Sequence, residues 1–475
     1  MNSNDLASAL AHFNKKRSAY LDDLKELVRI PSISFPGFDP EPVRRSAEFT
    51  SRMLSATGLT DVRILDPGQG HPAVFGQWTQ APGKPTILLY AHHDVQPTGR
   101  ETLWTTPPFD PVVRNNRLYG RGTADDKGGA VMHAAAIGSW LAACGRLPIN
   151  VKVLIEGEEE VGSTNLYKLL EQHRGLFAAD VVLIADSEHF DSSVPTLTAS
   201  LRGIVTVNVE VRSLASSVHS GTWGGPLPDP VLALSKMLAT LVDEQGRPAI
   251  PGLGKKVHSL SAAEKAALDA LPFREALYRK QSTLLESVGI TGGTGSVYEK
   301  MWYRPSIAVN AIEASSRKQA ANIINDAAWA RVGIRIVPDM DPQETLDLLT
   351  RHLRQHAPWG VTVTIEPESP SHWWKTDTSG PAFEAARYSL EQGYGRKPVV
   401  IGAGGSIPFV QTITDALGGV PALLFSVGDP YSAAHSENES LLIDDWERAC
   451  CSVIHLFGAL EERLTAKTSA ADAAK

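Results

Sequence analysis

The chain has 475 residues and a formal net charge of −8, from 45 Lys and Arg against 53 Asp and Glu. At about 100–200 residues per domain, this length predicts two or three domains. An apolar content of 43% and a charged content of 21% exclude a disordered or collagen-like chain. The mild acidity argues against nucleic-acid and membrane partners, because both need clustered Lys and Arg. Only three cysteines occur, which excludes a disulfide framework and favours a cytoplasmic location.

Short apolar runs typical of buried strands alternate with helical patterns at both ends of the chain. The expected strands are residues 86–90, 150–155 and 180–185 in the first part, and 398–401 and 422–427 in the last. The expected helices are residues 44–57, 130–144, 163–173, 381–392 and 441–464. Strands that alternate with helices in this way predict an α/β domain with a mostly parallel sheet.

The middle of the chain follows a different pattern. Residues 201–212 and 330–337 alternate between apolar and polar side chains, which is typical of strands with one exposed face. Helical patterns lie between these strands, at 229–241 and 264–271. We therefore expect an α+β domain over residues 200–375, inserted into an α/β domain made of residues 1–199 and 376–475.

Histidines or carboxylates follow five strands or strand-like runs. They are His92, His93 and Asp94; Asp125 and Asp126; Glu156, Glu158, Glu159 and Glu160; Asp186 and Glu188; and Asp429 and His435. Each group alone is more typical of a turn, a solvated loop or an exposed helix face than of a ligand. In open α/β sheets, however, sites form outside the carboxyl ends of the strands, so these segments are expected to converge on one pocket.

A pocket with this composition favours metal ions. Ionised carboxylates repel one another, so several in one place must take up protons or share a cation. Imidazoles and carboxylates without cysteine suit a catalytic zinc, manganese or cobalt site. The donors are too many for one tetrahedral ion with an open position, and they predict two ions about 3.5–4 Å apart. A ligand and a general base must be adjacent but distinct, and residue type alone does not choose among Glu158, Glu159 and Glu160.

Eight motifs occur in a fixed order over most of the chain: HHDVQP, LYGRGTADDKGG, EGEEEVGS, IADSE, VHSGTWGG, IRIVP, GGSIP and AHSENE. Together they resemble the di-zinc metallopeptidase family of cytosolic nonspecific (carnosine) dipeptidase, aminoacylase, carboxypeptidase G and acetylornithine deacetylase. GRGTADDKGG, HSGTWGG and GGSIP are most similar to the dipeptidase branch. The resemblance implies helices on both faces of the mostly parallel catalytic sheet, and an inserted α+β lid and dimerisation domain.

The resemblance also implies roles for residues of the catalytic domain. Asp125 bridges two divalent ions, with zinc expected first and manganese or cobalt as alternatives. The other implied ligands are His92 and Asp186 at one ion, and Glu160 and His435 at the other. Glu159 is the implied general base, which takes a proton from the water between the ions and returns it to the leaving amine. Asp94 is expected to orient His92, and the Asp125–Asp126 peptide is expected to be cis.

Four residues of the implied site lie outside those strand ends. His219 matches a histidine that similar enzymes supply from the partner subunit to the substrate carbonyl, which implies a homodimer; a loop histidine is the alternative. Arg335 matches a guanidinium that holds the substrate carboxylate; a salt bridge on a strand face is the alternative. Asn310 is a further implied substrate contact. Ser406 follows a strand and opens a helical pattern, where N–H groups without helical partners can bind a carboxylate.

The sequence therefore predicts a cytoplasmic, homodimeric, two-metal hydrolase that acts on the amide bond of dipeptides, without a nucleic-acid or membrane partner. Hydrolysis of N-acyl amino acids by the same residues is the alternative. A non-catalytic binding protein on this fold is the third hypothesis. Such a protein is expected to have lost ligands or the base, and here all five implied ligands and Glu159 are present.

Overall fold

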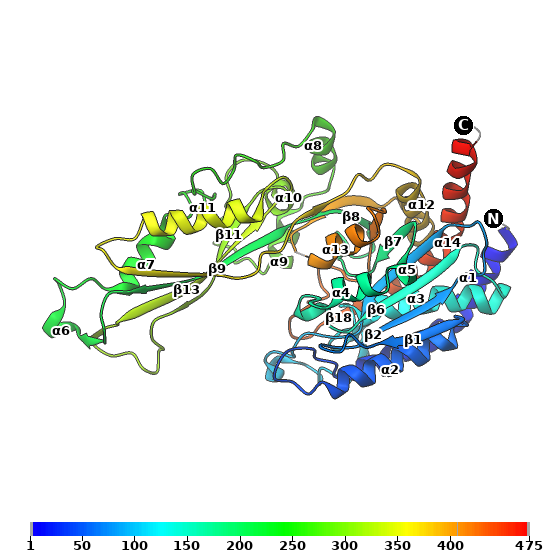
Figure 1. The fold of residues 1–475 in the computed structure, drawn as a ribbon, viewed down its shortest axis with the longest axis horizontal. Coiled ribbons are helices and arrows are strands. Elements are labelled where there is room, and N and C mark those ends of the chain that lie inside the picture. Colours follow the sequence, from blue (N-terminus) through cyan, green and yellow to red (C-terminus); the bar gives the residue numbers. More distant parts are fainter. Residues whose placement is uncertain (1–2, 406, 473–475) are drawn as a thin grey trace. The chain divides into compact units, whose positions relative to one another are not determined.

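The structure is a computed structural model that describes residues 3–405 and 407–472, without the side chains of residues 408 and 466–472. The chain divides into two compact units (Figure 1). Unit 1 comprises Met1–Ala199, Thr376–Ile401 and Phe409–Lys475, and unit 2 comprises Ser200–Lys375 and Gly402–Pro408. In the described part of the chain, no helix combines the length and the apolar character needed to cross a membrane.

The main sheet has the strand order β1-β2-β6-β3-β7-β17-β8-β15, and β16 also pairs with β8. Its strands are β1 (Asp61–Leu65), β2 (Ala73–Trp78), β3 (Thr86–His92), β6 (Asn150–Glu156), β7 (Val181–Ile184), β8 (Thr196–Leu201), β15 (Trp374–Lys375), β16 (Val399–Ala403) and β17 (Ala422–Leu424). The central strands β6, β3, β7 and β17 are parallel, which confirms the predicted fold class where the candidate site lies. The pairs β1–β2, β2–β6 and β8–β17 are antiparallel.

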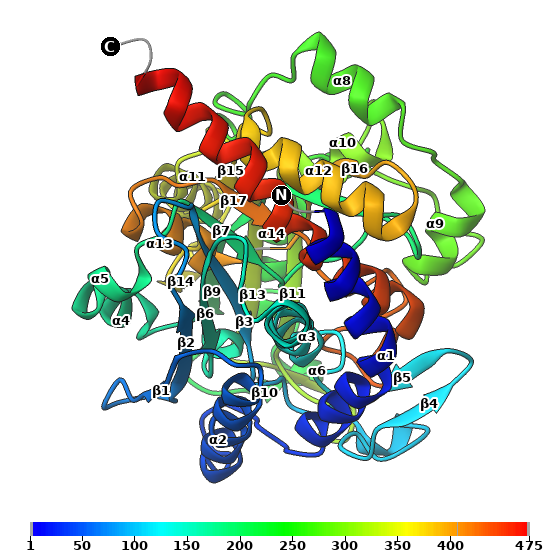
Figure 2. The ribbon, with the colours of Figure 1, turned by 90° about the vertical axis from the view of Figure 1, so that its right-hand side faces the viewer.

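Both faces of the central strands are covered, because successive side chains point to opposite faces. Ile87, Leu89 and Ala91 of β3 belong to the apolar core that includes helices α1 (Ser3–Val28), α3 (Lys127–Cys144), α12 (Pro381–Tyr394) and α14 (Ile443–Asp472). On the other face, the Tyr90 ring stacks on Phe409 of α13 (Pro408–Ala416), with ring centroids 4.3 Å apart. Figure 2 shows helices on either side of these strands. Double coverage explains why the strands are apolar throughout.

The remaining elements of unit 1 surround this sheet. They are α2 (Glu41–Ala56), η1 (Glu101–Leu103), η2 (Glu159–Val161), α4 (Leu166–Gln172) and α5 (Arg174–Phe177). A small antiparallel sheet has the order β18-β5-β4, with β4 (Val112–Arg114), β5 (Arg117–Tyr119) and β18 (Ser440–Leu442). In this sheet Ser440 pairs with Tyr119, so the segment after β5 lies beside the segment before β18.

Unit 2 is built on an antiparallel sheet of order β11-β13-β9-β14. Its strands are β9 (Gly203–Arg212), β11 (Ser306–Glu313), β13 (Ala327–Ile336) and β14 (Thr362–Pro367). The alternate side chains Val205, Val207 and Val209 are buried with residues of α7 (Pro230–Ala239) and α11 (Pro342–Gln355), while β11 is largely exposed. One covered face produces the alternation seen in the sequence. The other elements are β10 (Val218–His219), α6 (Ser220–Trp223), α8 (Ala262–Asp269), α9 (Glu275–Gln281), α10 (Val297–Trp302) and β12 (Ile323–Ile324).

Candidate metal centre

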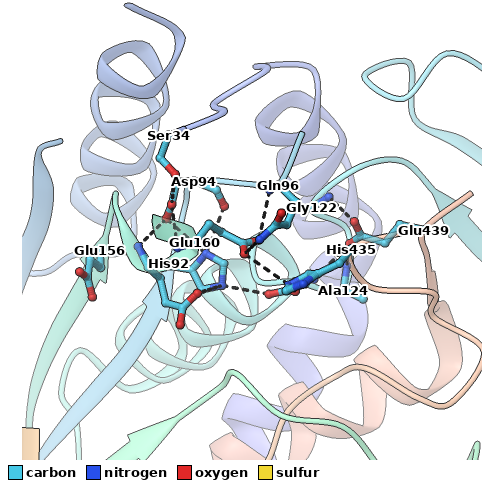
Figure 3. Close-up of polar contacts among 12 residues, drawn as sticks. Ser34, His92, Asp94, Gln96, Gly122, Ala124, Glu156, Glu160, His435 and Glu439 are labelled. Carbon is cyan, nitrogen blue, oxygen red and sulfur yellow. Dashed lines mark hydrogen bonds and ion pairs between the residues drawn. The ribbon is translucent and has the colours of Figure 1, made fainter. Parts of the chain in front are cut away.

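His92 is the last residue of β3, and its imidazole is completely buried. Its Nδ1 lies 3.1 Å from the backbone oxygen of Asp94. A carbonyl only accepts, so Nδ1 carries the proton of the neutral ring and Nε2 keeps a lone pair. Nε2 lies 3.0 Å from Oδ1 of Asp125 (Figure 3). Two acceptors at this distance require a cation or a proton between them, which suits a metal ligand and its neighbour.

The Asp125 carboxylate lies between two imidazoles. Oδ1 faces Nε2 of His92 at 3.0 Å, and Oδ2 faces Nε2 of His435 at 2.8 Å. A carboxylate that offers one oxygen to each of two imidazoles has the arrangement of a ligand shared by two ions. The peptide bond between Asp125 and Asp126 is cis, as the sequence resemblance implied.

Asp94 organises two sides of the centre. Its carboxylate lies 3.4 Å from Nδ1 of His92 and accepts a hydrogen bond from the Ser34 hydroxyl at 2.6 Å. It also accepts the backbone N–H groups of Glu159 and Glu160, at 3.2 and 3.1 Å. One buried carboxylate therefore orients the imidazole and holds the start of η2, which follows β6.

The two glutamates of η2 occupy different positions. Glu160 accepts hydrogen bonds from the backbone N–H and the side-chain amide of Gln96, at 3.2 and 2.7 Å, and lies 3.3 Å from Nε2 of His435. Glu159 lies 4.0 Å from Nε2 of His92. Donor atoms of His92, Glu159 and Asp186 lie within 4.8 Å of one another, and so do those of His92, Asp125 and Glu160. The structure thus brings together every implied ligand and the implied base.

The electrostatics of the cluster fit divalent ions. Burial, reinforced by the charge of Asp125, raises the pKa of Glu160 to about 8 and that of Asp186 to about 6. Burial and the charge of Asp186 raise the pKa of Glu159 well above its usual range. The hydrogen bond to Asp125 raises the pKa of His435 to about 9. A carboxylate cluster that holds protons in this way lacks positive charge, and two divalent ions would supply it with oxygen and imidazole donors that they accept.

The centre is open on one side. His435 leaves 57% of its side-chain surface exposed, whereas His92 leaves none. A catalytic metal site needs an open position for water and substrate, which a closed structural site lacks. The exposure of His435 shows that solvent reaches this side of the donor cluster.

Other residues of the five strand-end segments have structural roles. Nε2 of His93 contacts the backbone oxygen of Pro72 at 3.0 Å, and burial lowers the pKa of His93 to about 4. Asp429 forms a two-pronged ion pair with Arg117, at 2.8 and 2.9 Å. The Glu158 carboxylate accepts the backbone N–H groups of His71 and Asn165, at 3.1 and 2.6 Å. The Glu158 carboxylate is therefore occupied by these backbone N–H groups. This removes Glu158 from the three glutamates among which residue type left the metal ligand and the general base open.

Three of the remaining expected site residues lie in unit 2. His219 is exposed, and its Nδ1 accepts the backbone N–H groups of Gly221 and Thr222, at 3.1 and 3.2 Å. Arg335 on β13 is half-buried, and burial lowers the pKa of its guanidinium. Asn310 is exposed at a register shift of β11. The fourth, Ser406, lies outside the described residues.

Sequence reasoning missed three residues that support the centre: Gln96, Arg121 and Glu439. Gln96 binds Glu160 through two hydrogen bonds. Arg121 and Glu439 form a buried ion pair, with Nη1 and Oε2 2.7 Å apart. Gln96 and Glu439 stand within HHDVQP and AHSENE, and Arg121 stands within LYGRGTADDKGG. Their position inside these motifs is the sequence signal that could have identified them.

Comparisons with known proteins agree with this geometry. A family model described as Peptidase family M20/M25/M40 matches residues 88–457. The cysteinylglycine-S-conjugate dipeptidase of Corynebacterium striatum is 31% identical over 444 residues, which cover 92% of this chain and 95% of that protein. The Cys-Gly metallodipeptidase DUG1 of Saccharomyces cerevisiae is 28% identical, over 94% of this chain and 96% of that protein.

A solved structure shows the same fold over nearly the whole chain. Human carnosine dipeptidase 1 superimposes with a TM-score of 0.85 and 25% sequence identity, and the match covers 96% of this chain and 99% of that one. The family model spans well over half of the residues, and it includes every described residue of the centre. The chain is therefore a member of peptidase family M20/M25/M40.

Proposed function

We propose that this chain is a two-metal dipeptidase that hydrolyses the amide bond of a dipeptide with a free carboxylate. The observation that carries the proposal is the Asp125 carboxylate, which offers one oxygen to His92 and the other to His435. Glu160 and Asp186 add carboxylates whose pKa values are raised by burial and by the charge of Asp125. Membership of a peptidase family, with relatives that are named dipeptidases, supports amide hydrolysis of small peptides.

The ligands that we propose for the two ions are Asp125 as the shared carboxylate, His92 with Asp186, and Glu160 with His435. Two divalent ions bound there would polarise the scissile carbonyl and lower the pKa of the attacking water. Zinc suits this mixed set of imidazoles and carboxylates, and manganese and cobalt are the alternatives.

Glu159 is the proposed general base. The N–H group of Glu159 is held by Asp94, and its carboxylate lies at the edge of the donor cluster, 4.0 Å from His92. From this position Glu159 would take a proton from the attacking water and return it to the leaving amine. Burial raises the pKa of Glu159, which favours a carboxyl group that can hold this proton between the two steps.

Unit 2 is the proposed source of substrate contacts. Because Nδ1 of His219 accepts two backbone N–H groups, the neutral ring carries its proton on Nε2. That N–H would donate to the substrate carbonyl oxygen as negative charge develops on it. Arg335 would bind the substrate carboxylate, with Asn310 and Ser406 as further contacts. The half-buried position of Arg335 would strengthen its ion pair with the substrate carboxylate relative to an exposed pair.

We also propose a homodimer formed through unit 2, with His219 serving the site of the partner subunit. Large apolar side chains are exposed on this unit, including Trp223 at 55%, Leu232 at 59% and Ile312 at 61%. A dimer contact that covered these side chains would remove apolar surface from water. The cysteines Cys144, Cys450 and Cys451 are free thiols, which supports a cytoplasmic location.

Amine release from a panel of substrates tests the function. Chelator-stripped protein would be supplied with zinc, manganese or cobalt and offered dipeptides and N-acyl amino acids. We expect metal-restored cleavage of dipeptides, with acyl amino acids left intact. Cleavage of acyl amino acids alone would replace the dipeptidase proposal by a deacylase that uses the same centre. No cleavage with any of the three metals would contradict hydrolysis and favour a binding protein.

A further inference from the structure

We propose that the buried ion pair between Arg121 and Glu439 is a positioning device for the two-metal centre, and that it sets the spacing of the loops that carry the ligands. The inference rests on the two-metal site of the proposed function. It assigns a role to two residues whose side chains supply no donor atom to either cluster. All the contacts of this ion pair lie within unit 1.

The Glu439 carboxylate is the acceptor for the loop that presents Asp125. The carboxylate is completely buried and receives four hydrogen bonds. Oε2 accepts from Arg121 at 2.7 Å and from the backbone N–H of Gly122 at 2.9 Å. Oε1 accepts the backbone N–H groups of Ala124 and Asp125, at 2.9 and 3.2 Å (Figure 3). Glu439 therefore binds the backbone of the shared ligand itself.

Strand pairing brings Glu439 to this position. Ser440, the first residue of β18, pairs with Tyr119 of β5, and the Glu439 carbonyl accepts the N–H of Gly120 at 3.0 Å. His435 stands only four residues before Glu439 and faces the other oxygen of Asp125. The carboxylate thus joins the loop that carries Asp125 to the loop that carries His435.

Arg121 connects a third loop. Its guanidinium is 1% exposed, with Nη1 on Glu439 and Nη2 donating to the backbone oxygen of Pro97 at 3.1 Å. Pro97 follows His92, Asp94 and Gln96 in the segment after β3. The guanidinium also lies over the ring of Trp104, with 5.5 Å between Cζ and the centroid. The ion pair consequently holds all three loops that supply His92, Asp125 and His435.

Such a connection has a definite consequence for metal binding. Ligand atoms must hold their spacing to within a few tenths of an ångström to bind an ion well. Removing an outer hydrogen-bond partner of a ligand typically weakens metal binding by about 10–100-fold. Glu439→Gln replaces one carboxylate oxygen, which accepts two hydrogen bonds, by an NH₂ group. An NH₂ group cannot accept from N–H donors, so two of the four hydrogen bonds would be lost.

A matched control separates positioning from simple stabilisation. Asp445 is another completely buried carboxylate of unit 1. It accepts the backbone N–H of Ser193 at 2.6 Å, the Ser193 hydroxyl at 3.1 Å and Arg448 at 2.8 Å. These bonds resemble those of Glu439, but they join Asp445 only to the far end of the loop between β7 and β8, at Ser193, and none of them reaches the backbone of a proposed ligand. Asp445→Asn is therefore expected to lower the melting temperature without changing metal affinity.

The test is a calorimetric titration of zinc into chelator-stripped wild type, Glu439→Gln and Asp445→Asn, together with their melting temperatures. We expect Glu439→Gln to weaken zinc binding by about 10–100-fold, and Asp445→Asn to leave it unchanged. Zinc affinity that is equal in Glu439→Gln and wild type would overturn the inference. Wild type that takes up no zinc, manganese or cobalt would instead contradict the two-metal proposal itself.

A second variant keeps the test decisive if Glu439→Gln does not fold. Arg121→Lys retains the positive charge, but one ammonium group cannot reach both Glu439 and Pro97 with the geometry of the guanidinium fork. We expect a several-fold loss of zinc affinity in a folded protein with unchanged secondary structure. Unchanged zinc affinity in Arg121→Lys, with the melting temperature lowered, would assign the pair a purely structural role.

Discussion

The two units hold their candidate functional side chains in different ways. In unit 1, His92 and Asp94 are completely buried, and each has several hydrogen-bond or ion-pair partners. In unit 2, His219 and Asn310 are exposed. In unit 1, strand ends of a doubly covered parallel sheet deliver His92 and Asp94 into the interior. In unit 2, Asn310 lies on the exposed strand β11, and His219 lies on the small two-stranded sheet of β10 and β12.

The two units therefore differ in how far their candidate catalytic groups are preorganised. Unit 1 holds its charges in place before substrate arrives, which lowers the cost of reorganisation in the reaction. Unit 2 presents exposed groups, and in the proposed function these groups contact a substrate or a second subunit. Variants of unit 1 should therefore affect metal binding or turnover, and variants of unit 2 should affect substrate affinity or the turnover of the partner subunit.

Loss of the general base is the strongest test of unit 1. We expect Glu159→Gln to lower kcat by about 10²–10⁴-fold, because no other group would take the proton of the attacking water. Zinc affinity, measured by titration, should change by no more than a few-fold. Glu158→Gln is the matched control, since the Glu158 carboxylate accepts the backbone N–H groups of His71 and Asn165 instead. A Glu159→Gln enzyme with nearly full turnover would contradict the assignment.

The strongest test of unit 2 is complementation between subunits. His219→Ala should lower kcat by about 10²–10³-fold, the usual cost of losing one donor to a developing oxyanion. Mixed dimers of His219→Ala and Glu159→Gln contain one complete site if His219 acts in the partner's site. Equal mixing with subunit exchange should then restore roughly a quarter of wild-type activity, because half of the dimers are mixed and each has one of two sites intact.

The same mixture decides between the two arrangements of His219. If His219 acted within its own subunit, every site in the mixed dimer would lack either the base or the histidine. Activity would then stay at the level of the separate variants. Analytical ultracentrifugation of each variant checks that both still form dimers. A fully active wild-type monomer would contradict both the dimer and the shared site.

The sequence predicted the family, and the comparisons confirm it. It also predicted that histidines and carboxylates gather at strand ends, because the end of an apolar strand is a local property of the sequence. Residue type and position along the sequence alone do not choose between Glu158 and Glu159 as the general base. Both follow β6, and only the turn of η2 sends one into its loop and the other toward His92.

Residues whose role depends on tertiary pairing escaped prediction. Glu439 reaches the Asp125 loop because β18 pairs with β5, two strands more than 300 residues apart. Gln96 supports Glu160 across a shorter gap of 64 residues, between the segments after β3 and β6. Neither contact leaves a periodic or compositional trace. The roles of the implied ligands, of His219 and of Arg335 stay predictions until the variants are measured.

Substrate affinity tests the role of Arg335, the half-buried candidate residue of unit 2. Arg335→Gln should lower kcat/KM for dipeptides by about 10–100-fold, since a hydrogen bond between charged groups contributes about 1.5–3 kcal/mol. The same variant should cleave a C-terminally amidated dipeptide as well as wild type does. Arg331→Gln is the control on the same strand, because Arg331 forms a half-exposed pair with Glu368 at 2.6 Å, and such pairs contribute little. Equal losses for both substrates would contradict carboxylate binding by Arg335.

The pH dependence of stability gives the finest contrast between the units. Burial raises the pKa of Glu156, at the end of β6, to about 8. Between about pH 4.5 and 8 the folded state then holds a proton that the unfolded state has lost, so the contribution of Glu156 to stability falls as pH rises. Glu264 of unit 2 behaves oppositely: burial alone would raise its pKa, but hydrogen bonds with Lys375 and Ser261 lower it to about 2. Its contribution is complete above about pH 4.5 and is lost only as pH falls toward 2.

Two neutral variants isolate these contributions. Glu156→Gln removes the proton uptake, so wild type should lose stability relative to this variant as pH rises from 5 to 8, by on the order of a few kcal/mol. The stability difference between wild type and Glu264→Gln should stay constant over the same range, because Glu264 is ionised in both states there. Urea denaturation at pH 5, 6.5 and 8 measures both differences. A constant difference for Glu156→Gln would mean that this buried carboxyl is ionised in the folded protein, and that unit 1 tolerates an interior charge without an ion-pair partner, whereas Glu264 of unit 2 is paired with Lys375.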